Sequence, residues 1–524
     1  MSAKALQCPG LGILRQKEET LELKIEKSKT QNEHKKYYKN KAQMNPIASS
    51  SNTSTERPSN ELISQRRTKL MNSEFHHWID QMTFGNTKAE QFPLEFSPIE
   101  NKGFGMRSKK DIKNNEIILR LPLKDMTVNL YTVINEVSVR KFMSSAQCSA
   151  SSLKFEVEHL YIVFFISHKR KGYRSRLYPY FKLLPNNINV PNMWDNTTLN
   201  LLEIDERKRI FQEQDHVWDL YMILKEALNN ACMLVDLEFE EEFLWAYNVI
   251  KTRAFTCDYV KINKIKTMIA KYTDTKKFNL SSILSDSHVN KSAVNWLLVP
   301  YVDIINHSSG SYNCEYYTTE DEFIIHSNQA IKKHEEITIS YGDAASTNCL
   351  YNYGFVDTIE ENPFEEIHFR PEEIDENPLK YVRLEECGLY DSHEKQVLIG
   401  FSVTNLGCSV ALQKAAIMVS IESPKDINCV EFSDLLYCQY SYIPKEVKIL
   451  AENKLREILK NKIEKYERII SDIDGVNPKV CIAGEDKFMV KNLYLVMIRL
   501  LLRILNGDRS LYTLLDPVEQ QGDL

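Results

Sequence analysis

Two blocks of short strand-like segments, kept apart by a long helical stretch, constrain the fold of this 524-residue chain more than any other feature. In these blocks, short runs of alternating apolar and polar residues are broken by turn residues such as Asn101, Lys102 and Gly103, which is typical of paired strands. The expected strands lie near residues 94–99, 105–108, 117–121, 314–317, 322–326 and 336–340. The pattern predicts an α+β fold with a helical insert between two strand-rich parts.

Helical periodicity fills most of the remaining chain. Leu220, Ile223, Leu224 and Ala227 show the spacing of a helix face, and the same spacing returns beyond about residue 390. The first residues are instead rich in Lys, Glu, Gln, Asn and Ser, which bury little apolar surface. We therefore expect a disordered basic tail at 1–72, a main domain at 73–360 with a helical insert at about 186–294, and an all-helical C-terminal lobe at 361–524.

The charge of the chain limits its partners. The net charge of -6 lacks the positive field that attracts nucleic acids or anionic membranes, so we expect neither as a direct partner. Residues 1–70 carry 14 Lys and Arg against 7 Asp and Glu, which leaves the rest of the chain acidic. An acidic surface suits a basic peptide, although such a charge also serves solubility alone.

The cysteines and the apolar runs indicate where the protein works. The 11 cysteines include no C-x-x-C pair, so we expect no metal site. The most apolar stretch, residues 488–505, is interrupted by Lys491, Arg499 and Arg503, which argues against a membrane span, and we expect no signal peptide. These features favour a monomeric protein of the cytoplasm or nucleus with reduced thiols.

The first segment that could carry chemistry is the run from Lys102 to Arg107. It places Gly103 and Gly105 around Phe104, where the backbone could approach a ligand and Arg107 could reach a carboxylate. Taken alone, this segment is better explained as a hairpin turn with a surface arginine.

Two further segments combine polar and aromatic side chains. Asn306 and His307 stand together after an apolar run, where they could bind a ligand or tie down a loop by hydrogen bonds. Tyr341 ends the 336–340 run, and the Tyr353-Gly354-Phe355 stretch follows a dozen residues later. Aromatic walls attract cationic groups, but aromatic clusters also form ordinary cores.

Taken together and in this order, the three segments resemble the signatures of the SET domain. These are the Gly-x-Gly turn, the Asn-His pair in a D-x-x-N-H-S context, and an E-E-I-x-I-x-Y-G strand ending in tyrosine. Residues 177–185, 244–255 and 350–355 are in addition similar to stretches of the Rubisco large-subunit methyltransferase group, which includes lysine methyltransferases and an actin-histidine methyltransferase.

The resemblance implies a protein methyltransferase with a β-fold of short strands, a knotted C-terminal segment and a helical substrate-binding lobe. It implies S-adenosylmethionine as the methyl donor and a lysine-containing protein as the substrate. It further implies Tyr341 as the catalytic tyrosine, and Phe255, Val302 and Tyr341 as substrate-binding residues. The implied donor-binding residues are Gly103, Phe104, Gly105, Arg107, His168, Lys169, Arg170, Arg253, Asp303, Asn306, His307, Tyr353, Gly354 and Phe355, with backbone atoms in use at 168–170.

Four positions refine this reading. The histidine-specific branch of the group has asparagine where this chain has Phe255 and tryptophan where it has Val302, so the resemblance favours lysine. Where the group commonly has an acidic residue this chain has His168, and where the group has an asparagine after the catalytic tyrosine this chain has Ser346. Two alternatives stay open at this point: a SET-fold interaction module without catalysis, and a protein-histidine methyltransferase.

Overall fold

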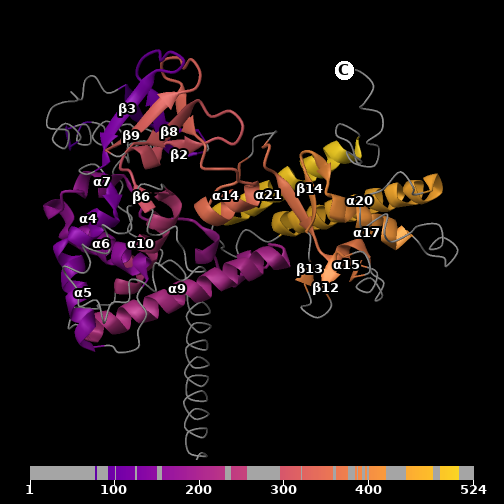
Figure 1. The fold of residues 1–524 in the computed structure, drawn as a ribbon, viewed down its shortest axis with the longest axis horizontal. Helices are drawn as coiled ribbons and strands as arrows, with labels where there is room; N and C mark the ends of the chain where they lie inside the picture. The colour runs from indigo at the N-terminus through magenta and orange to yellow at the C-terminus, as the bar shows by residue number, and fades with distance from the viewer. Residues whose placement is uncertain are drawn as a thin grey trace, which may run out of the picture.

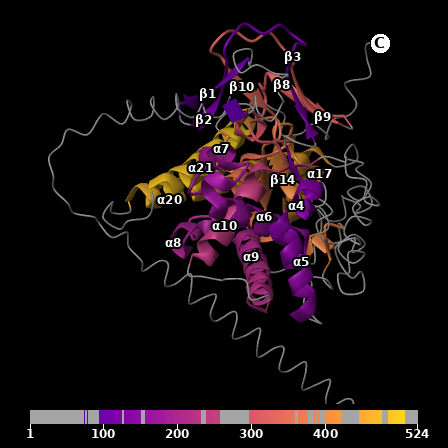
Figure 2. The ribbon, with the colours of Figure 1, turned by 90° about the vertical axis from the view of Figure 1, so that its left-hand side faces the viewer.

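Strands β2 (Gly103–Ser108), β3 (Ile117–Pro122), β8 (Cys314–Thr318) and β9 (Glu322–Ser327) gather at one end of the molecule in the computed structural model (Figure 1). In this view and in the view turned by 90° (Figure 2), the main strands lie above the helices between residues 130 and 253. The structure describes residues 73, 77–78, 93–100, 102–123, 127–149, 156–230, 238–256, 296–319, 321–357, 362–375, 384–385, 388–391, 396–397, 400–420, 444–475 and 484–506. The expected basic tail at 1–72 lies outside these residues.

The two strand-rich blocks pair with each other. One sheet has the order β1-β2-β10-β7, with β2 antiparallel to β1 and β10, and with β7 parallel to β10. Its strands are β1 (Leu94–Ile99), β2 (Gly103–Ser108), β7 (Asn306–His307) and β10 (Glu336–Ile339). Strands more than 200 residues apart in sequence therefore meet at the centre of this sheet.

Two smaller sheets also pair strands that are far apart in sequence. The order β3-β9-β8 is antiparallel throughout, and so is the order β4-β6-β5. Their strands are β3 (Ile117–Pro122), β4 (Val128–Asn129), β5 (Phe255–Thr256), β6 (Trp296–Leu298), β8 (Cys314–Thr318) and β9 (Glu322–Ser327). The strands expected in both blocks are thus confirmed, and so is the α+β class.

The helices between the two strand blocks begin earlier than residue 186. They are α4 (Leu130–Asn135), α5 (Val137–Ser149), α6 (Val157–Lys171), α7 (Tyr178–Leu183), α8 (Asn196–Leu199), α9 (Ile204–Asn230) and α10 (Phe239–Arg253). Helix α4 begins at a cap in which the Asn129 side chain accepts a hydrogen bond from the Thr132 backbone N–H. Helix α6 is buried along almost its whole length, as its apolar sequence requires.

The C-terminal lobe is not all-helical, which corrects the prediction. The lobe, which helix α14 (Ser346–Tyr353) precedes, has the helices α15 (Pro371–Ile374), α17 (Val410–Ser420), α20 (Lys445–Gly475) and α21 (Gly484–Leu505). Its strands are β11 (Glu366–Phe369), β12 (Tyr390–Asp391), β13 (Gln396–Val397), β14 (Phe401–Thr404) and β15 (Gly407–Cys408). These strands have two to four residues, too short for a period-two pattern to stand out beside the helical periodicity.

The molecule has two hydrophobic cores that share segments. The first core joins most of the strands from β1 to β10 to the helices α4–α7, α9 and α10. The second core belongs to the C-terminal lobe, yet it also contains Trp194, Leu199, Ile210 and Leu350. The start of α9 and helix α14 therefore fasten the lobe to the rest of the fold. Among the helices that the structure describes, none has the length and apolar character needed to span a bilayer.

Candidate functional site

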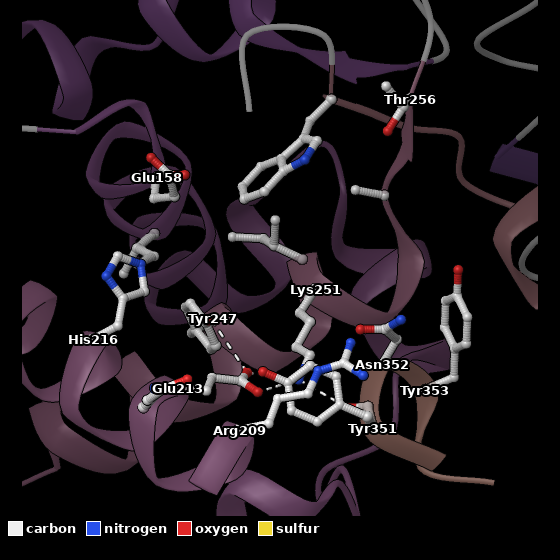
Figure 3. Close-up of a pocket in the computed structure, with 15 residues that line it drawn as sticks. Glu158, Arg209, Glu213, His216, Tyr247, Lys251, Thr256, Tyr351, Asn352 and Tyr353 are labelled. Atoms are coloured by element: carbon white, nitrogen blue, oxygen red, sulfur yellow. Dashed lines mark hydrogen bonds and ion pairs between the residues drawn. The ribbon is translucent and has the colours of Figure 1, made fainter. Parts of the chain in front are cut away.

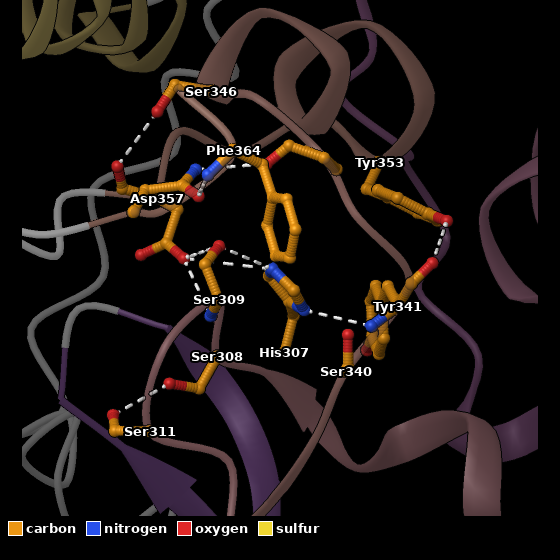
Figure 4. Close-up of polar contacts among 12 residues, drawn as sticks. His307, Ser308, Ser309, Ser311, Ser340, Tyr341, Ser346, Tyr353, Asp357 and Phe364 are labelled. Carbon is orange, nitrogen blue, oxygen red and sulfur yellow. Dashed lines mark hydrogen bonds and ion pairs between the residues drawn. The ribbon is translucent and has the colours of Figure 1, made fainter. Parts of the chain in front are cut away.

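The candidate site forms where β7 lies parallel to β10. Tyr341 follows β10, and its backbone N–H donates to Nδ1 of His307 at 3.0 Å. Its hydroxyl donates to the carbonyl oxygen of Ile305 at 2.6 Å. Figure 4 shows His307 and Tyr341 joined in this way. Both ends of the tyrosine are thereby fixed to the segment that contains the Asn306-His307 pair.

The segment before this pair has an unusual backbone. Tyr301 adopts a φ of 88°, a left-handed conformation that is rare for an aromatic residue. Its side chain is fully buried, and its hydroxyl donates to the carbonyl of Leu94 at 3.1 Å. Strained backbone of this kind clusters at functional sites, because surrounding contacts must hold it there.

Aromatic rings surround Tyr341. The ring of Tyr353 lies 4.9 Å from that of Tyr341 and the ring of Phe355 lies 6.4 Å from it, as centroid distances. Burial raises the pKa of the Tyr341 hydroxyl well above its usual value and raises the pKa of Tyr353 to about 12. Both hydroxyl groups therefore stay protonated at neutral pH and act as hydrogen-bond groups rather than as bases.

Gly105 leaves room next to Asn306. A Cβ atom at Gly105 would lie 2.5 Å from Nδ2 of Asn306 and 2.9 Å from Cγ1 of Ile99, which is too close for either neighbour. The Asn306 amide itself donates to Oε1 of Glu336 at 2.9 Å. Only glycine permits this approach of β2 to the Asn306 side chain.

A second polar group lies beside the site. Arg253 donates from Nη1 to the backbone carbonyl of Asp303 at 2.7 Å, and Tyr180 donates its hydroxyl proton to Oδ2 of Asp303 at 2.5 Å. Burial raises the pKa of Asp303 to about 6, although Arg253 and the Tyr180 hydroxyl oppose this shift. Nε of Arg253 is buried and has no hydrogen-bond partner among the described residues, so this site calls for a further acceptor.

Other expected donor-binding residues lie on the edge of this group. Phe104 stacks on Phe96 with ring centroids 4.7 Å apart. Arg107 donates from Nη1 to the carbonyl of His334 at 2.7 Å and is partly exposed. Gly354 ends α14 with a φ of 77°, and a Cβ atom there would meet the carbonyl oxygen of Asn189 at 2.0 Å. Gly354 is thus needed for chain packing in its own right.

The side chains at 168–170 make their contacts within the helical segment. His168 contacts the Ser175 hydroxyl at 2.7 Å, and burial lowers its pKa to about 4, so it is neutral at pH 7. The Lys169 ammonium lies 4.0 Å from the centre of the Trp245 ring, and Arg170 donates to Glu242 at 2.6 Å. The contacts of these three side chains all lie within the helical segment, and the role expected for the backbone at 168–170 stays a prediction.

The departure at Ser346 has a structural partner. Its hydroxyl donates to Oε2 of Glu365 at 2.6 Å, and its backbone N–H points to the same carboxylate at 3.2 Å. Ser346 therefore helps to hold the start of helix α14, which carries Tyr353 at its other end.

The expected substrate-binding residues differ in exposure. Phe255 packs its ring on Tyr316 and Phe323 at centroid distances of 5.1 and 5.5 Å, and it remains partly exposed. Val302 is fully buried in the core. Of the two, only Phe255 has surface to offer a bound side chain in this conformation.

A cavity of about 690 Å³ is lined by Tyr353 and by Ala254 and Thr256, the sequence neighbours of Phe255. Figure 3 shows Arg209, Glu213, Lys251 and Tyr351 gathered at one end of it, with Thr256 and Tyr353 on other sides. Nζ of Lys251 lies 2.6 Å from Oε1 of Glu213, so the two buried charges neutralise each other. Its complete lining is Glu158, Ile162, Arg209, Gln212, Glu213, His216, Tyr247, Ile250, Lys251, Ala254, Thr256, Trp296, Tyr351, Asn352 and Tyr353.

Sequence reasoning missed several residues of this site. Glu336 and Tyr180 were assigned no role, although they bind Asn306 and Asp303. Ser309 and Asp357 join the His307 side chain through hydrogen bonds. Glu336 and Tyr180 lie in stretches that the sequence singles out, but the contacts of all four residues arise from the pairing of segments that are not adjacent in sequence. In the part of the chain that the structure covers, His, Cys, Asp and Glu form no group able to hold a metal ion.

Comparison with known proteins finds a family that the two strand-rich blocks and the helices between them resemble. Residues 103–342 match the family model "SET domain". This part of the chain is similar to the SET domain and shares its fold. Tyr341 lies at the end of the matched region, and the Gly103–Gly105 turn lies at its start.

Two kinds of curated protein are similar to this chain. Human SET domain-containing protein 4 is 24% identical over 48% of this chain and 52% of its own length. Human actin-histidine N-methyltransferase is 21% identical over 50% of this chain and 39% of its own length. The chain thus spans about half, or less, of the curated relatives it matches.

Solved structures share the fold of the whole described molecule. The SET domain of LSMT bound to lysine and AdoHcy superposes with a TM-score of 0.52 and 18% identity, covering 84% of this chain and 91% of that one. Rubisco LSMT bound to AdoMet gives a TM-score of 0.50 and 19% identity with the same coverage. The likeness extends beyond the SET domain into the C-terminal lobe, because it covers far more than residues 103–342.

Proposed function

We propose that this chain is a protein methyltransferase that uses S-adenosylmethionine and modifies a lysine side chain of another protein. The observation that carries the proposal is the position of Tyr341. Its backbone N–H and its hydroxyl are both hydrogen-bonded to the Ile305–His307 segment, and its ring lies beside that of Tyr353. The SET domain and the methyltransferases among the relatives and structural neighbours support it.

The residues present fit S-adenosylmethionine. Its amino-acid end carries a carboxylate, which would satisfy the buried Nε of Arg253. The missing side chain of Gly105 leaves backbone open next to Asn306, where a ligand can approach closely. Tyr353 and Phe355 would form an aromatic wall on which a sulfonium cation is favourable.

When bound, S-adenosylmethionine supplies a methyl group carried by a positively charged sulfur. The chain's own part is to align the accepting nitrogen with that methyl and to exclude water. Tyr341 orients rather than removes a proton, since its raised pKa keeps the hydroxyl protonated. A lysine ammonium enclosed by Tyr341, Tyr353 and Phe255 would lose its proton more readily, because desolvation lowers the pKa of a buried amine.

Phe255 supports lysine as the target. Its ring is held by Tyr316 and Phe323 and offers an apolar, polarisable face but no hydrogen-bond group for an imidazole. The relatives with a histidine activity keep protein-histidine methylation as the second candidate. The two differ in the residue type that gains the methyl group on a modified peptide.

The first experiment is calorimetric titration of the full chain with S-adenosylmethionine, beside the Asn306→Ala and Tyr341→Phe variants. We expect binding by the wild type, loss of binding in Asn306→Ala, and retained binding without methyl transfer in Tyr341→Phe. Absence of heat from a folded wild type would favour an interaction module without catalysis.

The second experiment identifies the target. Extracts of cells that lack the protein are incubated with the enzyme and isotopically labelled donor, and labelled peptides are sequenced by mass spectrometry. Label on lysine supports the proposal, whereas label on histidine alone would overturn the lysine assignment and leave the methyltransferase activity standing.

A further inference from the structure

A row of hydrogen bonds leads away from Tyr341, and His307 is the first side chain in it (Figure 4). Nε2 of His307 lies 2.8 Å from Oγ of Ser309. Oγ of Ser309 lies 2.5 Å from Oδ2 of Asp357, and the Ser309 backbone N–H reaches the same oxygen at 3.1 Å. Together with the bond from the Tyr341 N–H to Nδ1 of His307, this makes a continuous row from Tyr341 to Asp357.

The carboxylate at the end sets the direction of every bond in the row. Oδ2 of Asp357 accepts from both the backbone N–H and the hydroxyl of Ser309, so the single hydroxyl proton of Ser309 points to Asp357. The Ser309 oxygen can then only accept from His307, which places the imidazole proton on Nε2. Nδ1 of a neutral ring with that tautomer has a lone pair, and this lone pair is what the Tyr341 backbone N–H requires.

The row is buried and joins two segments that no local motif connects. His307, Ser309 and Asp357 are each less than a tenth exposed. The His307 ring also lies between two rings of the site, with centroids 5.1 Å from Tyr341 and 5.9 Å from Phe355. A rotation of the imidazole would therefore displace the aromatic wall as well as the backbone of Tyr341.

We propose that Ser309 and Asp357 are positioning residues that hold Tyr341 in its reactive place by fixing the tautomer and orientation of His307. This inference rests on the proposed methyltransferase function. Neither residue touches the reacting atoms, so they act through His307 alone. Loss of either should misplace the Tyr341 hydroxyl, and small displacements of an orienting group lower turnover strongly.

The kinetic test compares Ser309→Ala and Asp357→Ala with the matched control Ser311→Ala, which removes a hydroxyl from the same loop but outside the row. We expect kcat to fall at least about tenfold in the first two, with KM and donor affinity within about threefold of the wild type. Ser309→Thr keeps the hydroxyl and should restore most of the rate. Equal kcat in all variants, or a fall in donor affinity as large as the fall in kcat, would overturn the proposal.

A spectroscopic test reads the row without turnover. The full chain is labelled with ¹⁵N-histidine, and the His307 signals are assigned by their loss in His307→Gln. We expect the Nε2–H tautomer in the wild type and in Ser311→Ala, and a mixture of ring states in Ser309→Ala and Asp357→Ala. An unchanged His307 tautomer in these two variants would show that Ser309 and Asp357 do not fix the state of the imidazole. If the wild type transfers no methyl group but the tautomer depends on Ser309, the proposed function fails while the positioning row stands.

Discussion

Gly105 shows how one absent side chain opens a binding surface. Its neighbours Asn306 and Ile99 belong to different segments, and both lie within 3 Å of the position that a Cβ atom would occupy. A methyl group there must push the Asn306 amide away from Glu336, to which it is bonded at 2.9 Å. The cost falls on the site rather than on the core, because Asn306 is partly exposed.

Gly105→Ala should therefore weaken S-adenosylmethionine binding at least tenfold, a loss of about 1.4 kcal/mol, while the chain stays folded. Calorimetry measures the affinity, and thermal unfolding checks the fold. The matched control is Gly400→Ala, since Gly400 has open space at its Cβ position and no left-handed backbone. Equal affinities for the two variants would remove Gly105 from the donor pocket.

The sequence predicts single residues of the site only where a motif marks them. Asn306, His307 and Tyr341 stand in recognisable runs, and the structure brings all three together. Ser309 and Asp357 belong to no recognisable run, and they meet only because the chain after α14 returns to the loop that follows β7. Such partners are set by tertiary pairing, which no short window of sequence contains.

At the scale of elements, a buried lysine ties three segments together. Lys462 of α20 has a side chain only 1% exposed, and its Nζ lies 3.0 Å from both Oε2 of Glu203 and Oε1 of Glu373. Lys465 binds the same two carboxylates from one turn further along. Glu203 precedes α9 and Glu373 belongs to α15, so this cluster fastens the C-terminal lobe to the helical segment.

Lys462→Ala should lower the free energy of unfolding by about 3 kcal/mol or more, because it leaves two buried carboxylates with one partner fewer. Lys460→Ala, which changes an exposed residue of the same helix, should stay within about 0.5 kcal/mol of the wild type. Chemical denaturation measures both. A small effect in Lys462→Ala would mean that solvent reaches the cluster and screens its charges.

The same cluster gives the protein a defined sensitivity to acid. Lys462 and Lys465 lower the pKa of Glu373 to about 2 against the opposing effect of burial, from an unfolded value near 4.5. Because the folded pKa is the lower one, the stabilisation is fully present above about pH 4.5 and is lost as the pH falls towards 2.

Glu373→Gln should therefore cost stability at pH 7, on the order of 2 kcal/mol after allowance for solvent screening, and progressively less below pH 4.5. Urea denaturation of the wild type and the variant between pH 3 and 7 measures the difference. A constant gap over this range would show that Glu373 acts by packing rather than by charge.

Elements with a strong period were predictable and short ones were not. The long helices α9, α20 and α21 and the strands around residues 94–122 and 314–339 follow from apolar spacing. The hairpin of β14 and β15 was not predicted, because strands of four and two residues are too short to show an alternation of apolar and polar residues. The helical insert expected at about 186–294 stays a prediction, and helices α4 and α6 lie before this range.

At the scale of the molecule, the two cores and the cavity define a path to the site. The cavity lies between helices α6, α9 and α10 and helix α14, and it reaches Tyr353 of the aromatic wall. Tyr351 and Arg209 line it and also line a smaller pocket of about 210 Å³ towards the C-terminal lobe. The Arg209 guanidinium lies 3.7 Å from the centre of the Tyr351 ring, so one residue pair separates the two spaces. Under the proposed function, the substrate segment would occupy the cavity next to this pair.

Thr256→Trp tests this path, because Thr256 is exposed on β5 and lines the cavity close to Phe255. The indole would fill space that the substrate needs, so we expect KM for the protein substrate to rise at least about tenfold with donor affinity unchanged, since only ground-state binding is lost. The matched control Thr197→Trp places the same ring on exposed α8, outside both spaces, and should behave as the wild type. Methyl-transfer kinetics on the substrate found by mass spectrometry measure KM, and calorimetry measures donor affinity. An unchanged KM in Thr256→Trp would mean that the substrate reaches Tyr341 from another side of the SET domain.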